Sequence, residues 1–285
     1  MSRRLCSDGR VTPTLLSRLE QYYDTVPRVG GARAEDFGPL TLFVREGAGW
    51  PYYARPALGS TGAGTADVER VLARQRQLGI PQAFEWVAET SPWLRAPVEA
   101  AGLRVSAHPL MVLEPSAPRL PAHPEVRLLG ADDELLTAAV TVPRLAFADP
   151  GTSVGAAGPA ELAEALADPA AAAHRGAVAE RLASGRTAVA AAVREGVVLA
   201  TGQYNPVGDV AEVAGVGTLP SARRQGLALA VTAALVADAL ARGTRTVFLS
   251  AGDDAVARIY ARAGFRTVAT ALIAEPAADG EAAGV

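Results

Sequence analysis

A pattern that occurs twice in this chain limits the folds open to it. In each copy an apolar strand leads through a polar turn into a helix, and a glycine followed by an apolar residue leads into a second strand. The copies are FEWVAETSPWLRAPVEAAGLRVSAHPLMVL, from Phe84, and TVFLSAGDDAVARIYARAGFRTVATALI, from Thr246. Strands that alternate with helices predict an α/β fold, and the repetition predicts two related halves.

The segment PSAPRLPAHP, residues 115–124, separates the two copies. Proline at every third position removes backbone donors and favours a stiff, extended connector. The length of 285 residues also favours two domains of ordinary size. We therefore predict a first domain over 1–114, a linker over 115–124, a second domain over 125–275 and a flexible tail over 276–285.

The first half is expected to open with a helix. Thr12 can cap this helix, Pro13 suits its first turn, and apolar residues from Leu15 to Tyr23 recur at helical spacing. Strands are expected to follow over 40–45 and 50–54, because both segments are apolar and bounded by turn residues.

In the second half, apolar runs predict a strand over 126–129 and a hairpin of strands over 187–194 and 197–205, turning at Glu195 and Gly196. Periodicity and caps give the remaining elements. These are a helix starting over 132–140, a loop over 149–159, a strand over 210–218, a helix from Arg223 to Gly243, a strand over 245–250, a helix over 253–263 and a last strand through Ala271. The sheet is predicted to be mixed and largely antiparallel, with flanking helices.

The charge and the cysteine content exclude several classes of protein. A net charge of −3 with no basic block does not favour nucleic acid or an anionic membrane as a partner. The start, MSRRLCSDGRV, lacks the apolar run of a signal peptide, and no stretch is long enough to cross a bilayer. Cys6 is the only cysteine, which fits a reducing compartment. A cytoplasmic protein is therefore expected.

No metal site is expected from the sequence. One cysteine cannot assemble a cysteine-based site, and His108, His123 and His174 show no ligand-type spacing. The histidines are interpreted as structural residues, and Cys6, far from every motif, as incidental.

The segment Val216–Ala230, VGTLPSARRQGLALA, has the composition of a phosphate-binding turn. A strand ends, a loop of small and basic residues follows, and a helix begins. The first amides of a helix have no intrahelical partner and carry a partial positive charge. Gly226 and Ala228 allow a pyrophosphate to approach the backbone, and Arg223 and Arg224 add positive charge. A helix cap with a solvated basic turn is the alternative interpretation.

This stretch resembles the signature of the GNAT acyltransferase superfamily, Q/R-x-x-G-x-G/A, with Arg223, Gly226 and Ala228 in register. The resemblance implies that acetyl-CoA is the cosubstrate and that the strand end lies along its pantetheine arm. A backbone N–H there would stabilise an oxyanion, an effect worth about 3 kcal/mol. The implied coenzyme-binding residues are Val216, Gly217, Thr218, Arg223, Arg224, Gln225, Gly226, Leu227, Ala228 and Leu229.

A second block, LSAGDDAVARIYARAGF, is similar to the later motif of the same superfamily, with Tyr260 at its tyrosine position and Gly264 and Phe265 at its end. Asp253 stands where most members carry asparagine. It can still cap the helix, but its negative charge leaves the usual contact with the pantetheine arm open.

Glu212 and Tyr260 are the candidate catalytic residues. An amine is almost all ammonium at neutral pH and must lose a proton, and a departing thiolate benefits from a nearby acid. The spacing from Glu212 to Arg223 resembles that of the catalytic glutamate in the histone-acetylating branch. Glu212 as an edge-strand surface charge, and Tyr260 as a packing residue, are the alternatives.

These motifs predict an N-acetyltransferase that acts by direct attack of a primary amine, expected to be a small molecule, without an acyl-enzyme. A monomer or a homodimer is expected. A non-catalytic acyl-CoA sensor is the alternative. A nucleotide-binding protein is less favoured, because the loop lacks both the Lys-Ser/Thr of a P-loop and G-x-G-x-x-G.

The first half resembles a degenerate GNAT unit, because no R-x-x-G-x-G/A precedes its copy of the repeat. Its aromatic residues, Trp50, Trp86, Trp93, Tyr52 and Tyr53, can form either a substrate wall or core packing. The glycine-rich loop over 149–159 is hypothesised to be a lid over the acceptor pocket.

Overall fold

The structure is a computed structural model that describes residues 14–47, 49 and 51–277. In the first half it contains α1 (Leu15–Val29), β1 (Ala32–Asp36), β2 (Leu40–Arg45), β3 (Ala54–Pro56), α2 (Thr65–Leu78), β4 (Phe84–Val87), η1 (Pro92–Leu94), α3 (Arg95–Ala100) and β5 (Leu103–Leu113). In the second half it contains β6 (Val126–Leu129), α4 (Leu136–Ala148), α5 (Pro159–Leu166), α6 (Pro169–Ala183), β7 (Ala188–Arg194), β8 (Val197–Val207), β9 (Val210–Thr218), η2 (Pro220–Ala222), α7 (Leu227–Ala241), β10 (Thr246–Ser250), α8 (Asp254–Arg262) and β11 (Phe265–Pro276).

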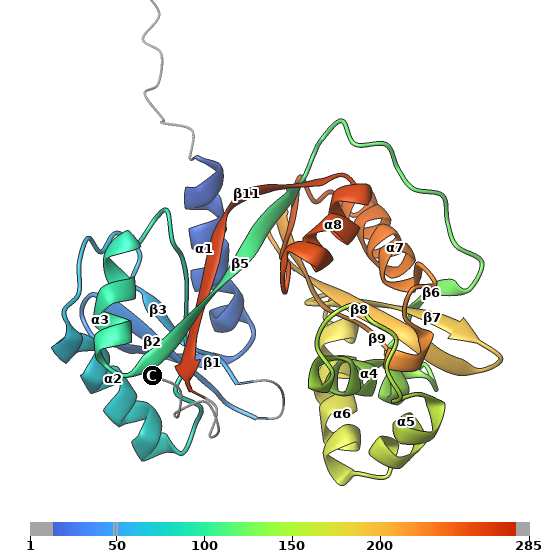
Figure 1. The fold of residues 1–285 in the computed structure, drawn as a ribbon, viewed down its shortest axis with the longest axis horizontal. Helices are drawn as coiled ribbons and strands as arrows, with labels where there is room; N and C mark the ends of the chain where they lie inside the picture. Colours follow the sequence, from blue (N-terminus) through green and yellow to red (C-terminus); the bar gives the residue numbers. More distant parts are fainter. Residues whose placement is uncertain (1–13, 48, 50, 278–285) are drawn as a thin grey trace, which may run out of the picture.

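The described strands form one sheet of 11 strands in the order β1-β2-β3-β4-β11-β5-β10-β9-β8-β7-β6. All neighbouring pairs are antiparallel except β3 with β4 and β9 with β10. The sheet is therefore largely antiparallel, as the sequence predicted, and helices flank it (Figure 1).

The last strand of each half pairs with a strand of the other half. β5 pairs with β10 of the second half, and β11 pairs with β4 of the first. β5 and β11 also pair with each other along their whole length, from Leu103 opposite Pro276 to Leu113 opposite Phe265. Figure 1 shows this pair as the long ribbon that joins the two halves. The two halves therefore share one sheet.

The two halves repeat one order of elements. The segment β3-α2-β4-α3-β5 has the same succession as β9-α7-β10-α8-β11, and the first two strands of each segment are parallel. A parallel pair needs a crossover connection, which α2 provides in one half and α7 in the other. This correspondence confirms the prediction of two related halves.

Helix α1 packs where the two halves meet (Figure 1). Its buried Leu19, Tyr22 and Tyr23 lie in one apolar cluster with Val210 of β9 and Phe248 of β10. The helix begins after Thr14, whose Oγ1 accepts a hydrogen bond of 3.2 Å from the amide of Ser17. The predicted cap Thr12 and Pro13 lie outside the described residues.

Several element boundaries differ from the sequence prediction. α4 begins at Leu136. The carboxylate of Asp133 accepts a 3.0 Å bond from the amide of Leu135 and so holds the preceding residues in a turn. The third strand begins at Ala54, later than predicted. β11 continues to Pro276 rather than ending at Ala271, because β5 offers it a partner along that length.

Helices α5 and α6 occupy residues that the sequence analysis left unassigned. Pro159 and Pro169 each stand at the first position of a helix, where proline is favoured. Asp168 caps α6 by accepting a 2.9 Å bond from the amide of Ala170. Both helices pack against α4 and complete the cover on that face.

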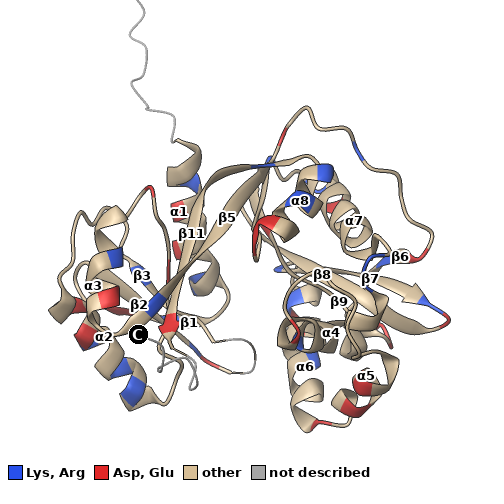
Figure 2. Cartoon of the chain, viewed as in Figure 1, with Lys and Arg blue, Asp and Glu red and all other residues tan. Residues whose placement is uncertain are grey.

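Charged residues of both signs are dispersed over the two halves (Figure 2). Within residues 14–47, 49 and 51–277, no group of three or more His, Cys, Asp or Glu side chains is placed to hold a metal ion. None of the helices described is long and apolar enough to cross a membrane.

Among the residues in the contact between the halves, Phe248 should be the one whose substitution lowers the stability of the protein most. It is fully buried, and its ring packs edge-on against Tyr22 at 4.9 Å and Tyr23 at 5.4 Å. We expect Phe248→Ala to lower the free energy of unfolding by about 3–5 kcal/mol, measured by urea denaturation. Phe147→Ala, at a side chain that is 53% exposed, should change it by less than about 0.5 kcal/mol. Equal effects of the two substitutions would contradict this role.

Candidate functional site

A cavity of about 660 Å³ opens where β9 and β10 part. The two strands pair from Val210 opposite Thr246 to Glu212 opposite Phe248. Beyond this point β10 pairs on its other edge with β5 through Ser250, while β9 continues to Thr218. Residues 213–218 of β9, the loop that follows, and α8 line the space between them.

The structure brings most of the predicted site residues together around this cavity. Glu212 and Gln225 are the two predicted residues that do not line it. Those that do are Val216, Gly217, Thr218, Arg223, Arg224, Gly226, Leu227, Ala228, Leu229, Asp253 and Tyr260.

The loop before α7 presents unpaired amides to the cavity. Arg224 and Gly226 have left-handed backbones, with φ of 67° and 78°, so the helix begins at Leu227 rather than at Arg223 as predicted. The first intrahelical bond runs from the amide of Ala230 to the carbonyl of Gly226, at 3.0 Å. The amides of residues 227–229 precede it and therefore have no helical partner. No atom lies within 4 Å of a Cβ built on Gly226, which leaves room for an anion.

The side chain of Arg223 does not serve the role predicted for it. Its guanidinium donates hydrogen bonds to the carbonyls of Ala146, Asp149 and Ser153, and only 8% of the side chain is exposed. The predicted positive charge is therefore bound by these carbonyls and lies 3.7 Å from the carboxylate of Asp149. It holds the loop after α4 in place instead.

The glycine-rich loop that was hypothesised to be a lid is docked onto η2. The amide of Gly155 donates to the carbonyl of Pro220 at 3.1 Å, and the amide of Ser221 donates to the carbonyl of Ala157 at 3.0 Å. Residues 150–152 of the loop line the cavity. In this conformation the loop is a fixed wall of the site.

Two arginines of α8 line the cavity and were not predicted. Arg258 and Arg262 are four residues apart, so they lie on one face of the helix. With Arg224 they supply the positive charge of the wall. Their spacing of four residues was visible in the sequence. Which face of α8 turns toward the cavity was not, because this depends on how the helix packs on the sheet.

Strand β9 has a bulge inside the cavity. Thr201 pairs with Gly217 and Gln203 with Ala214, so Gly215 and Val216 together face one residue of β8. A bulge leaves backbone groups without ladder partners. Beside it the buried Oγ1 of Thr218 has no hydrogen-bond partner among the described residues. This wall of the cavity therefore offers polar groups for an extended ligand.

Asp253 and Tyr260 place a carboxylate and a phenol at the other wall. The carboxylate of Asp253 caps α8 by accepting a 2.7 Å bond from the amide of Val256, as predicted. Tyr260 is 7% exposed, and burial raises its pKa to about 12. The phenol therefore keeps its proton and acts as a donor at neutral pH.

The side chain of Gln225 points away from the cavity. Its Oε1 accepts a 2.9 Å hydrogen bond from Arg194 Nη1 of β7. Only its backbone, within the loop, is in a position to serve the predicted phosphate site.

Glu212 stands at the last paired position before β9 and β10 part. It follows Val210 by two residues, so it faces the same side of the sheet, beneath α1. Burial raises its pKa to about 7, and the charge of Arg55 opposes this shift. A carboxyl group with this pKa is partly ionised at neutral pH.

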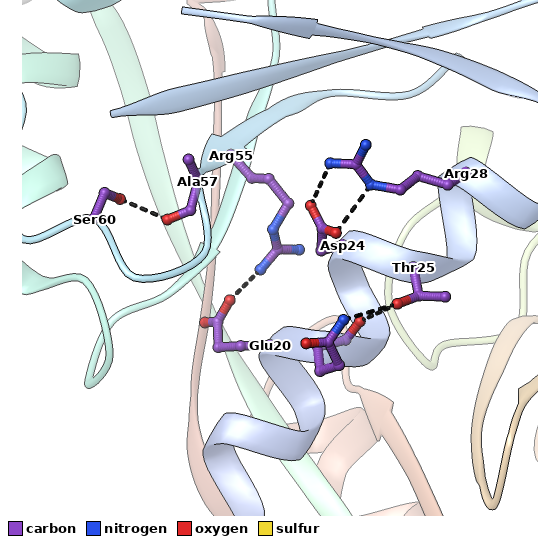
Figure 3. Close-up of polar contacts among 8 residues, drawn as sticks. Glu20, Asp24, Thr25, Arg28, Arg55, Ala57 and Ser60 are labelled. Carbon is purple, nitrogen blue, oxygen red and sulfur yellow. Dashed lines mark hydrogen bonds and ion pairs between the residues drawn. The ribbon is translucent and has the colours of Figure 1, made fainter. Parts of the chain in front are cut away.

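Residues of the first half surround Glu212. Burial, followed by the charge of Glu212, raises the pKa of Glu85 on β4 to about 8. Burial and Glu212 also raise the pKa values of Tyr22 and Tyr23 well above the usual value. Arg55 of β3 is 1% exposed and pairs with Glu20 of α1 at 2.5 Å, as Figure 3 shows.

Two of the aromatic residues of the first half pack in its core, which was one of the two interpretations. Trp86 is buried in the core of that half, and Trp93 packs against the same core. Tyr53 is close enough to Glu85 and Glu212 for their charges to raise its pKa, although burial is the larger cause. Trp50 lies outside the described residues.

The model of the Acetyltransferase (GNAT) family matches residues 160–265. This segment contains Glu212, the loop before α7, and α8. No curated protein matches the chain.

Several solved structures share the fold over nearly the whole chain. A GCN5-related N-acetyltransferase from Kribbella flavida is 24% identical, with a TM-score of 0.65 over 93% of this chain and 97% of its own. A GCN5-related N-acetyltransferase from Sphaerobacter thermophilus is 18% identical, with a TM-score of 0.53 over 86% and 84%. A tandem GNAT protein from the clavulanic acid biosynthesis pathway is 16% identical, with a TM-score of 0.54 over 87% and 86%. At these identities the likeness concerns the fold.

The raised pKa of Glu212 should appear in the pH dependence of stability. The folded protein holds this proton more tightly than the unfolded chain, where the pKa is near 4.5. The corresponding stability is complete below that value and is lost as the pH rises through about 7. Glu212→Gln should not show this loss. Its free energy of unfolding, taken relative to that of the wild type, should therefore rise by on the order of 2 kcal/mol from about pH 5 to about pH 8. Urea unfolding at both pH values measures this difference.

Glu164→Gln is the control for this measurement, because Glu164 is an exposed carboxylate on α5. Its unfolding free energy should follow the wild type at both pH values. A Glu212→Gln variant with the pH dependence of the wild type would show that Glu212 ionises normally in the folded protein.

Proposed function

Residues 160–265 form a GNAT acetyltransferase-family domain in a chain with the two-half GNAT fold, and we propose that the protein transfers an acetyl group from acetyl-CoA to an amine. The parting of β9 and β10 carries this proposal. A partly ionised carboxyl group, Glu212, stands at the last paired position before the strands part, and the cavity that opens beyond it has unpaired helix amides in its wall. The carboxyl group proposed to remove the proton and the amides proposed to bind the anion thus lie at one opening in the sheet.

The cavity fits the parts of a coenzyme A molecule. The amides of residues 227–229, with Arg224, Arg258 and Arg262, suit its phosphates. The bulge of β9 and the unpartnered Oγ1 of Thr218 suit the amides of its pantetheine arm. Acetyl-CoA, when bound, supplies the thioester that is the acyl donor.

Glu212 is proposed to accept the proton that an ammonium group must lose before it attacks. A base with a pKa of about 7 is partly ionised at neutral pH and still holds a proton well. The amine nitrogen forms the new bond to the acyl carbon as the carbon–sulfur bond breaks. The proton from nitrogen passes through Glu212 to solvent, and the released thiolate gains one from solvent.

Tyr260 is proposed to donate a hydrogen bond to the departing sulfur. Its pKa of about 12 lies above the value of about 8.5 for a thiol. The phenol therefore shares its proton with the thiolate and retains it. This arrangement stabilises negative charge on sulfur and needs no acyl-enzyme.

The acceptor is proposed to be a small molecule with a primary amine. Glu212 is half-buried beneath α1 and is surrounded by the first half, so a folded protein surface has little room to approach it. We also propose a cytoplasmic protein that acts as a monomer or homodimer, without nucleic acid or membrane as a partner.

A non-catalytic acyl-CoA sensor is the second candidate function. Asp253 favours it, because this residue adds a carboxylate to a wall that is otherwise suited to anions. Under this alternative, acetyl-CoA raises the melting temperature while no amine in a broad panel releases free thiol. Thiol release with any amine favours the transferase.

Gly226→Trp should abolish binding of acetyl-CoA. The indole would fill the open space beside the amides of α7, where no atom now lies within 4 Å of a Cβ. Gly226→Ala is the matched control, because any side chain at a φ of 78° carries similar backbone strain, about 1–2 kcal/mol. We expect weakened binding for alanine and none for tryptophan by titration calorimetry. Equal binding by both variants would place the coenzyme elsewhere.

Tyr260→Phe should lower kcat more than it weakens coenzyme binding. The phenyl ring keeps the packing against Phe265, whose centroid lies 6.2 Å away, and removes only the donor. We expect kcat to fall at least tenfold, because a hydrogen bond to a charged group is worth about 1.5–3 kcal/mol, with the acetyl-CoA Kd changed by less than about twofold. An unchanged kcat would remove Tyr260 from the mechanism.

A further inference from the structure

Asn205 on β8 lies between a group of acidic side chains and a group of basic side chains. It pairs with Glu212 across β8 and β9. Its backbone carbonyl accepts a 2.8 Å hydrogen bond from the hydroxyl of Tyr22 on α1, and its Oδ1 accepts a 2.5 Å bond from Arg181 Nη2 on α6. These contacts put a carboxyl group on one side of Asn205 and a guanidinium on the other.

On the acidic side, two carboxyl groups have no cation of their own. Glu212 and Glu85 are both half-buried, and the charge of Glu212 acts on Glu85. Arg55 is the cation that acts on both of them. Its guanidinium is already paired with Glu20 at 2.5 Å, as Figure 3 shows. An ammonium group entering here would meet two carboxyl groups that have no ion pair among the described residues, and its positive charge would favour their ionised forms.

On the basic side, Arg181 has no carboxylate within ion-pair distance among the residues that the structure describes. The basic groups near it are Arg45, Arg186 and His174, and burial lowers the pKa of His174, so that its imidazole is neutral at neutral pH. Arg186 is paired with Glu180 at 3.4 Å. The guanidinium of Arg45 lies over the ring of Tyr52, 4.2 Å from its centroid. A half-buried arginine whose only hydrogen-bond partner is a neutral amide favours an anion nearby.

The distance between the two sides suits one small molecule. Glu212 and Asn205 are directly opposed across two antiparallel strands, about 5 Å apart at Cα. The guanidinium of Arg181 lies one hydrogen bond, 2.5 Å, beyond the side-chain oxygen of Asn205. An ammonium and an anionic group a few bonds apart span such a distance.

We propose that the acceptor is an amine that also carries an anionic group, with its ammonium at Glu212 and Glu85 and its anion at Arg181 and His174. This inference rests on the proposed function and narrows its substrate class to amino acids and related amino anions. The first half then has a direct role, because Glu85 and the phenols around Glu212 come from it. An amine without the anion would leave the charge of Arg181 uncompensated.

The first experiment compares matched acceptors that differ only in the anion. The panel contains lysine and cadaverine, phenylalanine and phenethylamine, and alanine with ethylamine and 1-aminoethylphosphonate. We expect kcat/KM with acetyl-CoA to be at least tenfold higher for the better acceptors with an anionic group than for their counterparts without one, about 1.4 kcal/mol. The alanine set distinguishes a site for carboxylate from one for phosphonate. Equal kcat/KM within every pair would overturn the inference.

The second experiment removes the cation. Arg181→Gln should raise KM at least tenfold for the anionic acceptors and leave their counterparts unchanged, while Arg181→Lys should retain part of the preference. Arg175→Gln is the matched control, because Arg175 is on the same helix and donates to the carbonyl of Ala131 at 3.3 Å. It should keep the preference. A uniform loss over all acceptors in Arg181→Gln would indicate a structural role and overturn the assignment.

A binding measurement separates the inference from the proposed function. Titration calorimetry of the same panel with the wild-type protein and free coenzyme A detects acceptor binding without transfer. If anionic amines bind and lose affinity in Arg181→Gln but none is acetylated, the inference stands and the transferase proposal fails. If amines without an anionic group are acetylated as well as those that carry one, the transferase stands and the inference fails. If no anionic amine binds or is acetylated, the inference is overturned.

Discussion

β10 changes its hydrogen-bonding partner at Phe248, and the site exists because of this change. Residues 246–248 pair with β9, whereas residues 248–250 pair with β5 on the opposite edge. Since β5 belongs to the first half, the strand that draws β10 away from β9 is supplied by the other half of the chain. The cavity beyond Glu212 is therefore a product of the pairing between the halves.

The same contact sets the chemistry of Glu212. α1 packs over Phe248, and Tyr22 and Tyr23 thereby come to lie around the carboxyl group. Without that cover the side chain would face water, and its pKa would stay near the ordinary value. The raised pKa thus depends on the first half, although the residue lies in the second. A half without a phosphate loop of its own can contribute to the site in this way.

The parts of the site that follow from local sequence were predictable. The loop before α7 depends on a strand end, two left-handed residues and a helix start, which all lie within residues 216–230. The cap at Asp253 and the helix that carries Tyr260 are equally local. Glu212 was selected because its spacing to Arg223 resembles that of the catalytic glutamate in one branch of the GNAT superfamily, and its catalytic role stays a prediction.

The remaining features depend on contacts between distant residues. The pairing of β5 with β10 joins residues more than a hundred positions apart, and no periodicity encodes it. Arg223 carried a signature position, yet its side chain binds carbonyls near residue 149, which only the docked loop reveals. Glu85 and Arg181 showed no motif, because each matters only for the residues that the fold places beside it.

The pairing of β11 with β4 also affects the order in which the protein can form during synthesis. Residues 84–87 emerge from the ribosome long before residues 271–274, which cover their edge. Until then, β4 keeps unpaired N–H and C=O groups along that edge, and such edges can pair with other chains. A nascent first half is therefore an unfinished sheet that must be kept apart from its neighbours until residues 271–274 have been synthesised.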